Sequence, residues 1–431
     1  MRKITIIGGG LAGCECAYQL LKRGYEVDLY EMRPERGTPA HKTDKLCELV
    51  CSNSLKSTDV GTSQGALKKE AALLDCFVLR MAEACAVPAG GALAVDREKF
   101  SEKVEEELLR FPNLNLIRKE NAEINDWTVI AAGPLASEKL TDKIAALSGE
   151  EHLHFFDAVA PIVKADSIDM DHAFFAGRYG KGGEDYLNLP MEKDEYYAFV
   201  KELVGAEKAL LRDFEKGDVF EACMPVEVMA ARGEDTLRFG PLRPVGLFDP
   251  KTGRRPYAVV QMRKEDANGV LYNMVGFQTN LKFGEQKRVF GMIPALHDAE
   301  FVRYGVMHRN TFVNAPMLLN EDFSLKKNDT VFFAGQISGV EGYVESIVGG
   351  LMCAINIDRR AKGLPSVIPP ETTLTGGLMR YVAAPNPDFQ PMHVSFALLP
   401  SIEGIRDKKK RKEEYGKRAV SDMERFASEI L

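Results

Sequence analysis

The sequence predicts an α/β protein in which a Rossmann-like domain is built from both ends of the chain and carries an inserted α+β domain. A glycine-rich strand–helix–strand unit stands at the N-terminus, and two later segments, 127–137 and 329–360, each lead a buried strand into glycine. Between them, apolar and polar residues alternate between Gly and Pro breaks, as in antiparallel strands. We place the first domain at residues 1–155 and 325–431, and the insertion at 155–325.

The composition fits a globular protein of two or three domains. The chain has 431 residues, 45% hydrophobic and 28% charged. Its eight cysteines are scattered, with neither CxxC pairs nor a His cluster at zinc spacing, so we expect free thiols and no metal. The first strand runs straight into glycines, unlike a signal peptide or a membrane span, so a cytoplasmic protein without membrane contact is expected.

The charge is unevenly distributed. A net charge of -7 argues against indiscriminate nucleic-acid binding. Residues 223–310 nevertheless hold thirteen Lys and Arg against nine Asp and Glu, and residues 406–418 hold eight against three. Two basic clusters in an acidic protein indicate a site for a polyanion.

The N-terminal stretch "KITIIGGGLAGCECAYQLLKRGYEVDLYEMRP" has the order required for dinucleotide binding: strand, glycines, helix, second strand and acid. Gly8 permits the tight turn, Gly10 lets the backbone approach a pyrophosphate, and Gly13 lets the helix pack against the strand. The helix N-terminus offers N–H groups to the phosphates. Glu31 can accept both ribose hydroxyls. The predicted contacts are Gly8, Gly9, Gly10, Leu11, Ala12, Gly13 and Glu31.

Two later segments favour FAD over NAD as the dinucleotide. "WTVIAAGPLAS", 127–137, is a buried strand that ends in Ala-Ala-Gly-Pro, where two-dinucleotide-fold flavoproteins return the chain to the cofactor. In 329–360 a strand, a glycine-rich turn and a helix follow one another, so Gly335 and Gln336 can face the flavin and Tyr343 can cover its ring.

The sequence resembles the bacterial folate- and FAD-dependent tRNA (uracil-5-)-methyltransferases over nearly its whole length. The resemblance rests on "GGGLAGCECAYQL" with "YEMRP", on "LCELVCSNSLKS", on "GALKKEAALLD", on "EACMPVEVMAARGEDTLRFGPLRPVGL" and on "FAGQISGVEGYVESIVGG". Common flavin folds do not require the second and fourth of these motifs, which makes them the most specific.

The resemblance implies methylation at C5 of the uridine at position 54 in the T-loop of tRNA. It implies methylenetetrahydrofolate as carbon source and FAD, reduced by NADPH or NADH, as electron source, without S-adenosylmethionine. Uracil C5 is a poor nucleophile until a thiolate adds to C6, and by the resemblance Cys223 matches that thiolate. Cys51 matches a second active-site cysteine, either the base that removes the C5 proton or a partner of the nucleophile.

The sequence also leaves three other functions open. They are the same chemistry on ribosomal RNA, a flavin oxidoreductase that uses Cys47 and Cys51 as a redox pair, and an RNA-binding scaffold that keeps FAD structurally. For tRNA we expect contacts through shape and phosphate. The expected basic contacts are Arg254, Arg255, Arg263, Lys264, Lys287 and Arg288.

Overall fold

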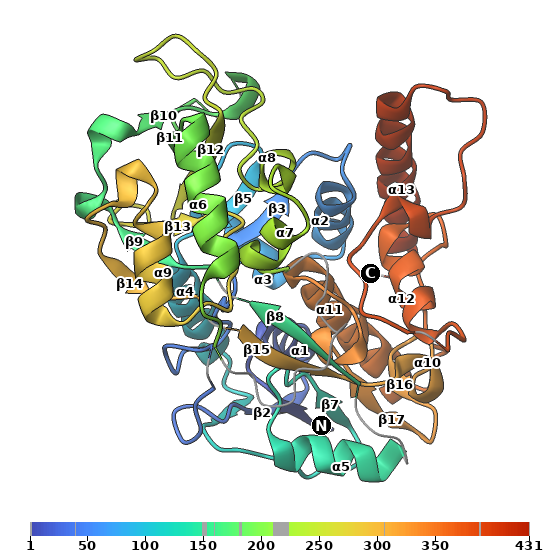
Figure 1. The fold of residues 1–431 in the computed structure, drawn as a ribbon. Helices are drawn as coiled ribbons and strands as arrows, with labels where there is room; N and C mark the ends of the chain where they lie inside the picture. Colours follow the sequence, from blue (N-terminus) through green and yellow to red (C-terminus); the bar gives the residue numbers. More distant parts are fainter. Residues whose placement is uncertain are drawn as a thin grey trace.

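The computed structural model describes residues 2–38, 40–148, 153–158, 160–180, 183–209, 224–305, 307–387 and 389–430. Two large sheets form the centres of two parts that lie side by side (Figure 1). Cys223, the predicted nucleophile, falls outside the described residues.

The first sheet is six-stranded and parallel except at one edge. Its order is β16 (Ser324–Leu325), β17 (Asn328–Phe333), β7 (Thr128–Ile130), β1 (Lys3–Ile7), β2 (Glu26–Tyr30) and β6 (Leu114–Ile117), with only β16 antiparallel to its neighbour. The chain moves from β1 to β2 on one side and enters β7 on the other side of β1. Dinucleotides bind at such a switch point, beyond the carboxyl ends of the strands.

Two helices from opposite ends of the chain pack together beside this sheet. They are α1 (Leu11–Lys22) and α11 (Tyr343–Ala361), and nearly all of α11 is buried. A Cβ atom on Gly350 would lie 2.1 Å from the carbonyl oxygen of Ala12, so only glycine permits this approach. Buried residues from 4–144 and from 312–427 thus share one hydrophobic core, and the predicted α/β fold class is confirmed.

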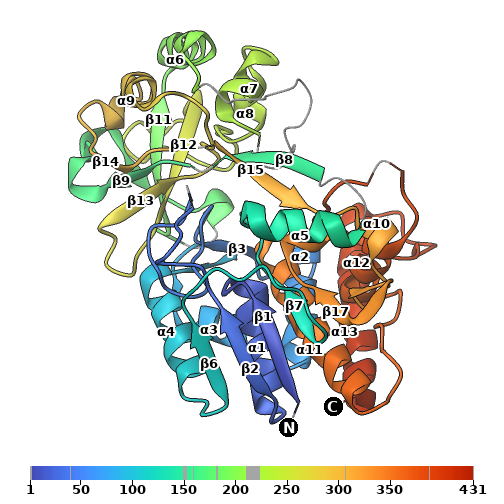
Figure 2. The same cartoon turned by 90° about the horizontal axis from the view of Figure 1, so that it is seen from below.

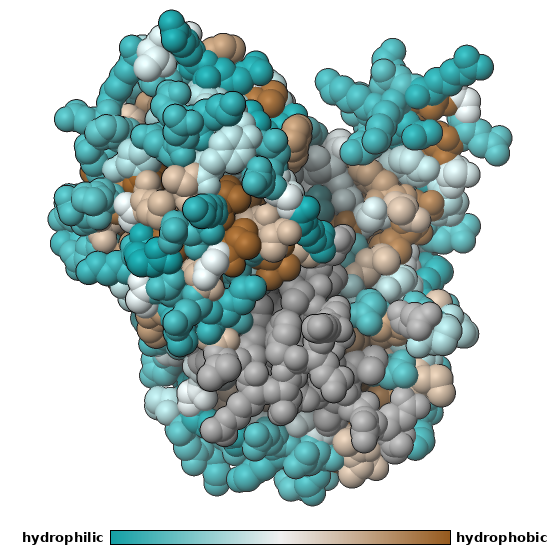
Figure 3. All heavy atoms as spheres, in the orientation of Figure 1, coloured by the Kyte–Doolittle hydropathy of each residue, from teal (hydrophilic) through white to brown (hydrophobic). Residues whose placement is uncertain are grey.

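The other helices and strands of this part surround the sheet. They are β3 (Ser54–Ser57), β4 (Ala86–Val87), β5 (Ala92–Val95), α2 (Ser63–Leu73), α3 (Phe77–Ala84), α4 (Arg97–Leu109), α5 (Glu138–Ser148), α10 (Ala315–Leu318), α12 (Leu374–Ala383) and α13 (Lys408–Ile430). The lysine-rich start of α13 forms a hydrophilic projection that stands apart from the second part (Figures 1 and 3). None of the described helices is long and apolar enough to cross a membrane.

The second part contains an antiparallel sheet with its own core. The strand order is β10 (Phe174–Phe175), β11 (Tyr186–Met191), β12 (Ala258–Lys264), β13 (Leu271–Met274), β9 (Ile162–Lys164) and β14 (Phe301–Arg303). Its helices are α6 (Lys193–Gly205), α7 (Val226–Ala231), α8 (Thr236–Phe239) and α9 (Phe283–Phe290). Phe199, Phe277 and Phe290 lie fully buried in this core.

The chain passes between the two parts through one antiparallel pair of strands. These are β8 (Leu153–Ala158) and β15 (Met307–Phe312), and they lie between the two sheets in Figure 2. The domain boundaries near residues 155 and 325 remain predictions, with these two strands as the physical connection.

Candidate functional site

The N-terminal glycines form a cradle at the switch point of the first sheet. Gly8 has φ +112°, and a Cβ there would lie 2.4 Å from the Ala131 carbonyl oxygen. A Cβ on Gly13 would lie 1.9 Å from the Gly8 carbonyl oxygen, whereas a Cβ on Gly10 would meet no protein atom within 4 Å. Gly8 and Gly13 are thus required by packing, while Gly10 leaves space open in front of the helix. Helix α1 has neither a side-chain cap nor an acid in its first turn, so its terminal N–H groups suit a phosphate.

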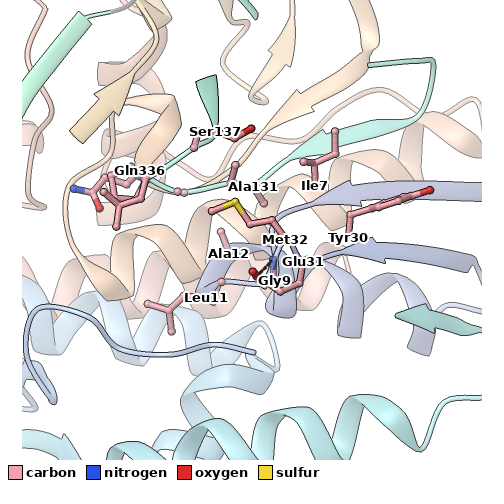
Figure 4. Close-up of a pocket in the computed structure, with 18 of the residues that line it drawn as sticks. Ile7, Gly9, Leu11, Ala12, Tyr30, Glu31, Met32, Ala131, Ser137 and Gln336 are labelled. Atoms are coloured by element: carbon pink, nitrogen blue, oxygen red, sulfur yellow. Dashed lines mark hydrogen bonds between the residues drawn. The ribbon is translucent and has the colours of Figure 1, made fainter. Parts of the chain in front are cut away.

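Glu31 lies at the end of β2 beside this cradle. Its Oε2 accepts a hydrogen bond from the Gly9 backbone N–H (3.1 Å), and its Oε1 accepts from the Arg33 backbone N–H (3.0 Å) and Arg33 Nε–H (2.8 Å). Figure 4 shows the Gly9 contact at the centre of the pocket. Burial raises the pKa of Glu31, but the hydrogen bonds and charge of Arg33 outweigh it and hold the pKa below its usual value. Of about four acceptor positions on a carboxylate, three are used here, which leaves room for one ribose hydroxyl rather than two.

The cavity in front of the cradle has about 1000 Å³ of empty space, part of it open to solvent. Gln336 lies at the opposite end of this cavity from Tyr30 (Figure 4). Gly335, with φ +79°, brings the backbone so close to α1 that a Cβ would lie 2.8 Å from Ala12 Cβ. The residues predicted to bind the cofactor all line this cavity except Gly13: Gly8, Gly9, Gly10, Leu11, Ala12, Glu31, Gly335, Gln336 and Tyr343.

Tyr343 connects this cavity to the segment that carries Cys51. Its hydroxyl oxygen accepts hydrogen bonds from the backbone N–H groups of Cys51 (2.8 Å) and Ser52 (3.1 Å). Burial raises the pKa of Tyr343, so the phenol is neutral. The predicted cofactor residue and the second predicted cysteine therefore meet at one point, although 292 positions separate them in sequence.

Three arginines hold the same segment from other elements. Arg97 of α4 donates to the Leu49 carbonyl (2.7 Å), and Arg303 of β14 donates to the Val50 carbonyl (2.9 Å). Arg263 of β12 donates to Asn53 Oδ1 and Ser52 Oγ, both at 2.8 Å.

These contacts correct one sequence expectation and add two residues that it missed. Arg263 was expected to contact RNA, but it is only 6% exposed, because its guanidinium is used inside the protein. Arg97 and Arg303 are the two missed residues, since no motif in their local sequence marks them as part of the site. Arg97 also forms an ion pair with Glu265 of the second part (2.6 Å), so the Cys51 segment lies at a charged contact between the two parts.

Cys47 does not have the surroundings of a redox partner for Cys51. The segment between them is not helical, so the spacing does not place both on one helix face. Cys47 is fully buried, its N–H donates to the Gly9 carbonyl (2.8 Å), and burial raises the pKa of its thiol well above the usual range. A thiol that resists ionisation is a poor redox nucleophile.

Glu227, which follows the predicted nucleophile in sequence, is also occupied inside the fold. Its carboxylate is fully buried and accepts from Thr279 Oγ1 (2.9 Å) and the Asn280 N–H (2.8 Å). Burial raises its pKa. Its acceptors are therefore used to join α7 to the chain before α9.

Within the described residues, no three His, Cys, Asp or Glu side chains converge to hold a metal ion.

The other basic residues differ in how available they are to a polyanion. Arg254, Arg255 and Lys287 are exposed and Lys264 is half-buried. Arg288 forms ion pairs with Glu202 (2.5 Å) and Glu285 (2.8 Å), so its charge is already neutralised.

Comparison with known proteins agrees with this geometry. Residues 3–365 match the family model of glucose inhibited division protein A. A methylenetetrahydrofolate–tRNA-(uracil-5-)-methyltransferase TrmFO from Natranaerobius thermophilus is 54% identical, covering 100% of both chains, and one from Lactobacillus johnsonii is 52% identical, covering 100% of this chain and 99% of its own. The solved structure of Aquifex aeolicus GidA has the same fold, with a TM-score of 0.72 at 14% identity over 99% of this chain and 73% of its own. The chain therefore belongs to the methylenetetrahydrofolate–tRNA-(uracil-5-)-methyltransferase family, TrmFO, as its motifs indicated.

Proposed function

We propose that this protein methylates C5 of the T-loop uridine of tRNA, at position 54, with methylenetetrahydrofolate as carbon source and NADPH or NADH as reductant. The names of its relatives give the reaction class. The single observation that carries the proposal is the contact of Tyr343 with Cys51, since it brings a nucleotide-binding cavity and a thiol of the family motif to one place.

The cavity fits FAD on this chain's own residues. The open space at Gly10 and the uncapped start of α1 suit the pyrophosphate, and Glu31, held ionised by Arg33, suits a ribose hydroxyl. The far wall at Gln336 and Tyr343 then bounds the flavin end. When bound, FAD supplies the electrons that convert the transferred one-carbon unit into a methyl group.

Cys223 is the proposed nucleophile, and its warrant is the family motif and the chemistry. Addition of its thiolate to C6 of uracil gives C5 the electron density to attack an electrophilic carbon, and loss of the C5 proton then lets the thiolate leave. The S–C6 bond that forms in the first step breaks in the last, so the thiolate is regenerated.

Cys51 is proposed to take the C5 proton or to assist the nucleophile. Tyr343 accepts from its backbone N–H, and Arg97 donates to the Leu49 carbonyl of the same segment. Arg97 also lies close enough to interact electrostatically with both Cys51 and Tyr343. A positive charge beside a sulfur favours the thiolate, which is the form that accepts a proton.

The test is formation of 5-methyluridine on an unmodified tRNA transcript with methylenetetrahydrofolate and NADPH, in the absence of S-adenosylmethionine. We expect product from the flavin-loaded wild type, and none from Cys223→Ala or Cys51→Ala at equal flavin content. Formation of 5-methyluridine on ribosomal RNA but not on tRNA would show that ribosomal RNA is the substrate. Full activity of Cys223→Ala would show that Cys223 is not the nucleophile. Bound flavin that NAD(P)H cannot reduce would favour the RNA-binding scaffold.

A further inference from the structure

A second cavity lies at the end of the antiparallel sheet and shares no lining residue with the first. It is formed by the start of α6, by α8 with the loop that follows it, and by the residues that enter β12. The loop after α8 is the yellow-green segment at the top of Figure 1. This region includes the end of the "EACMPVEVMAARGEDTLRFGPLRPVGL" motif, which a flavin fold does not require.

The charge of this cavity is positive. Lys193, Arg238, Arg243 and Arg255 line it, against one carboxylate, Glu192. Arg238 is paired with Asp235 (3.0 Å). Among the described residues, no carboxylate lies within ion-pair distance of Lys193, Arg243 or Arg255, and all three are exposed. Three cations that have no carboxylate partner in the described part of the chain, placed around one hollow, favour an anionic ligand.

Aromatic rings complete the cavity. Phe239 is 81% exposed, an unusual position for the side chain of a phenylalanine in a folded protein. Tyr257 also lines the cavity, with the guanidinium of Arg238 over its ring at 3.6 Å. Arg238 is fixed there, because its Nε–H donates to the Tyr257 carbonyl (3.1 Å). Outside the lining, Phe248 is 59% exposed beneath the guanidinium of Arg255 (5.6 Å).

Exposed rings interleaved with unpaired arginines are the features that bind unpaired nucleotides, because bases stack on aromatic or guanidinium faces while cations hold the phosphates. We propose that this cavity binds an unpaired nucleotide of the tRNA substrate, with the base stacked on Phe239 and the phosphates held by Arg243, Arg255 and Lys193. The inference rests on the proposed function, since it adds a second contact for the same RNA, away from the flavin cavity. An acidic protein segment would use the cations but would not require the open Phe239 ring.

The test compares full-length, flavin-loaded variants in binding of an unmodified tRNA transcript at several salt concentrations. We expect Phe239→Ala to weaken binding about fivefold to a hundredfold with an unchanged salt slope, and Phe239→Tyr to bind like the wild type. We expect Arg243→Ala to weaken binding and to reduce the salt slope by about one.

Two matched controls lie on the same domain. Lys282→Ala removes an equal charge that is already paired with Glu207, and Phe283→Ala removes another exposed ring (55%) that stacks on Tyr304. Neither should change tRNA affinity by more than about twofold. Flavin content, reduction by NADPH and thermal unfolding should match the wild type in all variants, which separates lost binding from lost folding.

The outcomes distinguish this inference from the proposed function. Failure of the wild type to bind or methylate tRNA would reject the proposed function itself. Normal activity of the wild type with unchanged affinity in Phe239→Ala and Arg243→Ala would reject only the second cavity. Loss in Arg243→Ala alone would show an electrostatic surface without base stacking. An equal loss in Phe239→Ala on a fully paired RNA duplex would show that the contact does not require an unpaired nucleotide. Either result would overturn the nucleotide site.

Discussion

The hydroxyl oxygen of Tyr343 lies 2.8 Å from the backbone nitrogen of Cys51, so one phenol joins the first turn of α11 to the cysteine segment. The same oxygen accepts from Ser52, and the neighbouring carbonyls are taken by Arg97 and Arg303. The position of Cys51 is therefore set by side chains from three distant elements rather than by its local sequence.

Replacement of Tyr343 by Phe should lower turnover while flavin stays bound. The change leaves two N–H groups without an acceptor, which costs about 1–3 kcal/mol and frees the Cys51 segment to move. Methyl transfer and thermal unfolding would be measured together. The matched control is Tyr381→Phe. The hydroxyl of Tyr381 donates to the exposed carbonyl of Gln390, so its loss should leave turnover and stability as in the wild type. Wild-type turnover in Tyr343→Phe would show that this contact does not position Cys51.

Gly10→Ala should weaken flavin binding without unfolding the protein. The added methyl group would meet no protein atom but would occupy the space in front of α1, so we expect about tenfold lower affinity or worse. Gly37→Ala is the control, because its Cβ also meets nothing and it does not line the cavity. Titration of the flavin-free variants with FAD would measure both. Equal affinities would place the pyrophosphate elsewhere.

Cys47→Ala should retain methyl transfer, whereas Cys51→Ala should lose it. Cys47 packs in the core with a thiol that resists ionisation, while Cys51 is half-buried at the Tyr343 contact. Turnover of both variants with NADPH checks this. The opposite pattern would revive a Cys47–Cys51 redox pair.

Arg263→Ala should destabilise the protein by about 2–4 kcal/mol, because it leaves Asn53 Oδ1 and Ser52 Oγ without their donor at the contact between the two parts. Urea unfolding would measure this loss. The exposed Arg254→Ala should leave stability within about 0.5 kcal/mol. If Arg263→Ala instead kept full stability and lost tRNA affinity, the earlier RNA expectation would be right.

Because of Glu70, the free energy of unfolding should decrease as the pH rises from about 4.5 to about 7. It is fully buried and accepts from the N–H groups of Leu374 and Thr375, and burial raises its pKa from 4.5 to about 7. The folded state then binds more protons than the unfolded state in this window, so rising pH costs up to about 3 kcal/mol and the loss levels off above pH 7. Unfolding at pH 5 and pH 8 should show a smaller difference in Glu70→Gln than in the wild type. Glu424→Gln, on the exposed face of α13, should keep the full difference.

The first sheet and its cavity could be predicted because their signals are local. A turn such as Gly8 to Gly13 fixes a backbone shape within six residues, and Glu31 follows at a set distance along the next strand. Except for Gly13, which packs the helix against the strand, those residues line one cavity in the structure.

The rest depends on contacts between distant elements. Arg97, Arg263 and Arg303 meet at one segment from α4, β12 and β14, and nothing in their local sequence marks that meeting. Cys47 and Cys51 are four residues apart, the spacing of one helical turn, but the segment is not helical and the Cys47 N–H donates to the Gly9 carbonyl. The second cavity was hidden because a turn-rich stretch does not show which of its side chains, such as Phe239, face solvent.

The approach of Gly350 to Ala12 has a consequence for the order in which the molecule can be completed. Synthesis delivers the cradle of α1 first, but one wall of its cavity, at Gly335 and Tyr343, comes from the far end of the chain. The whole antiparallel sheet is made in between. A ribosome-bound chain thus has no finished cofactor cavity until α11 has emerged, so cofactor capture reports that most of the chain has been made.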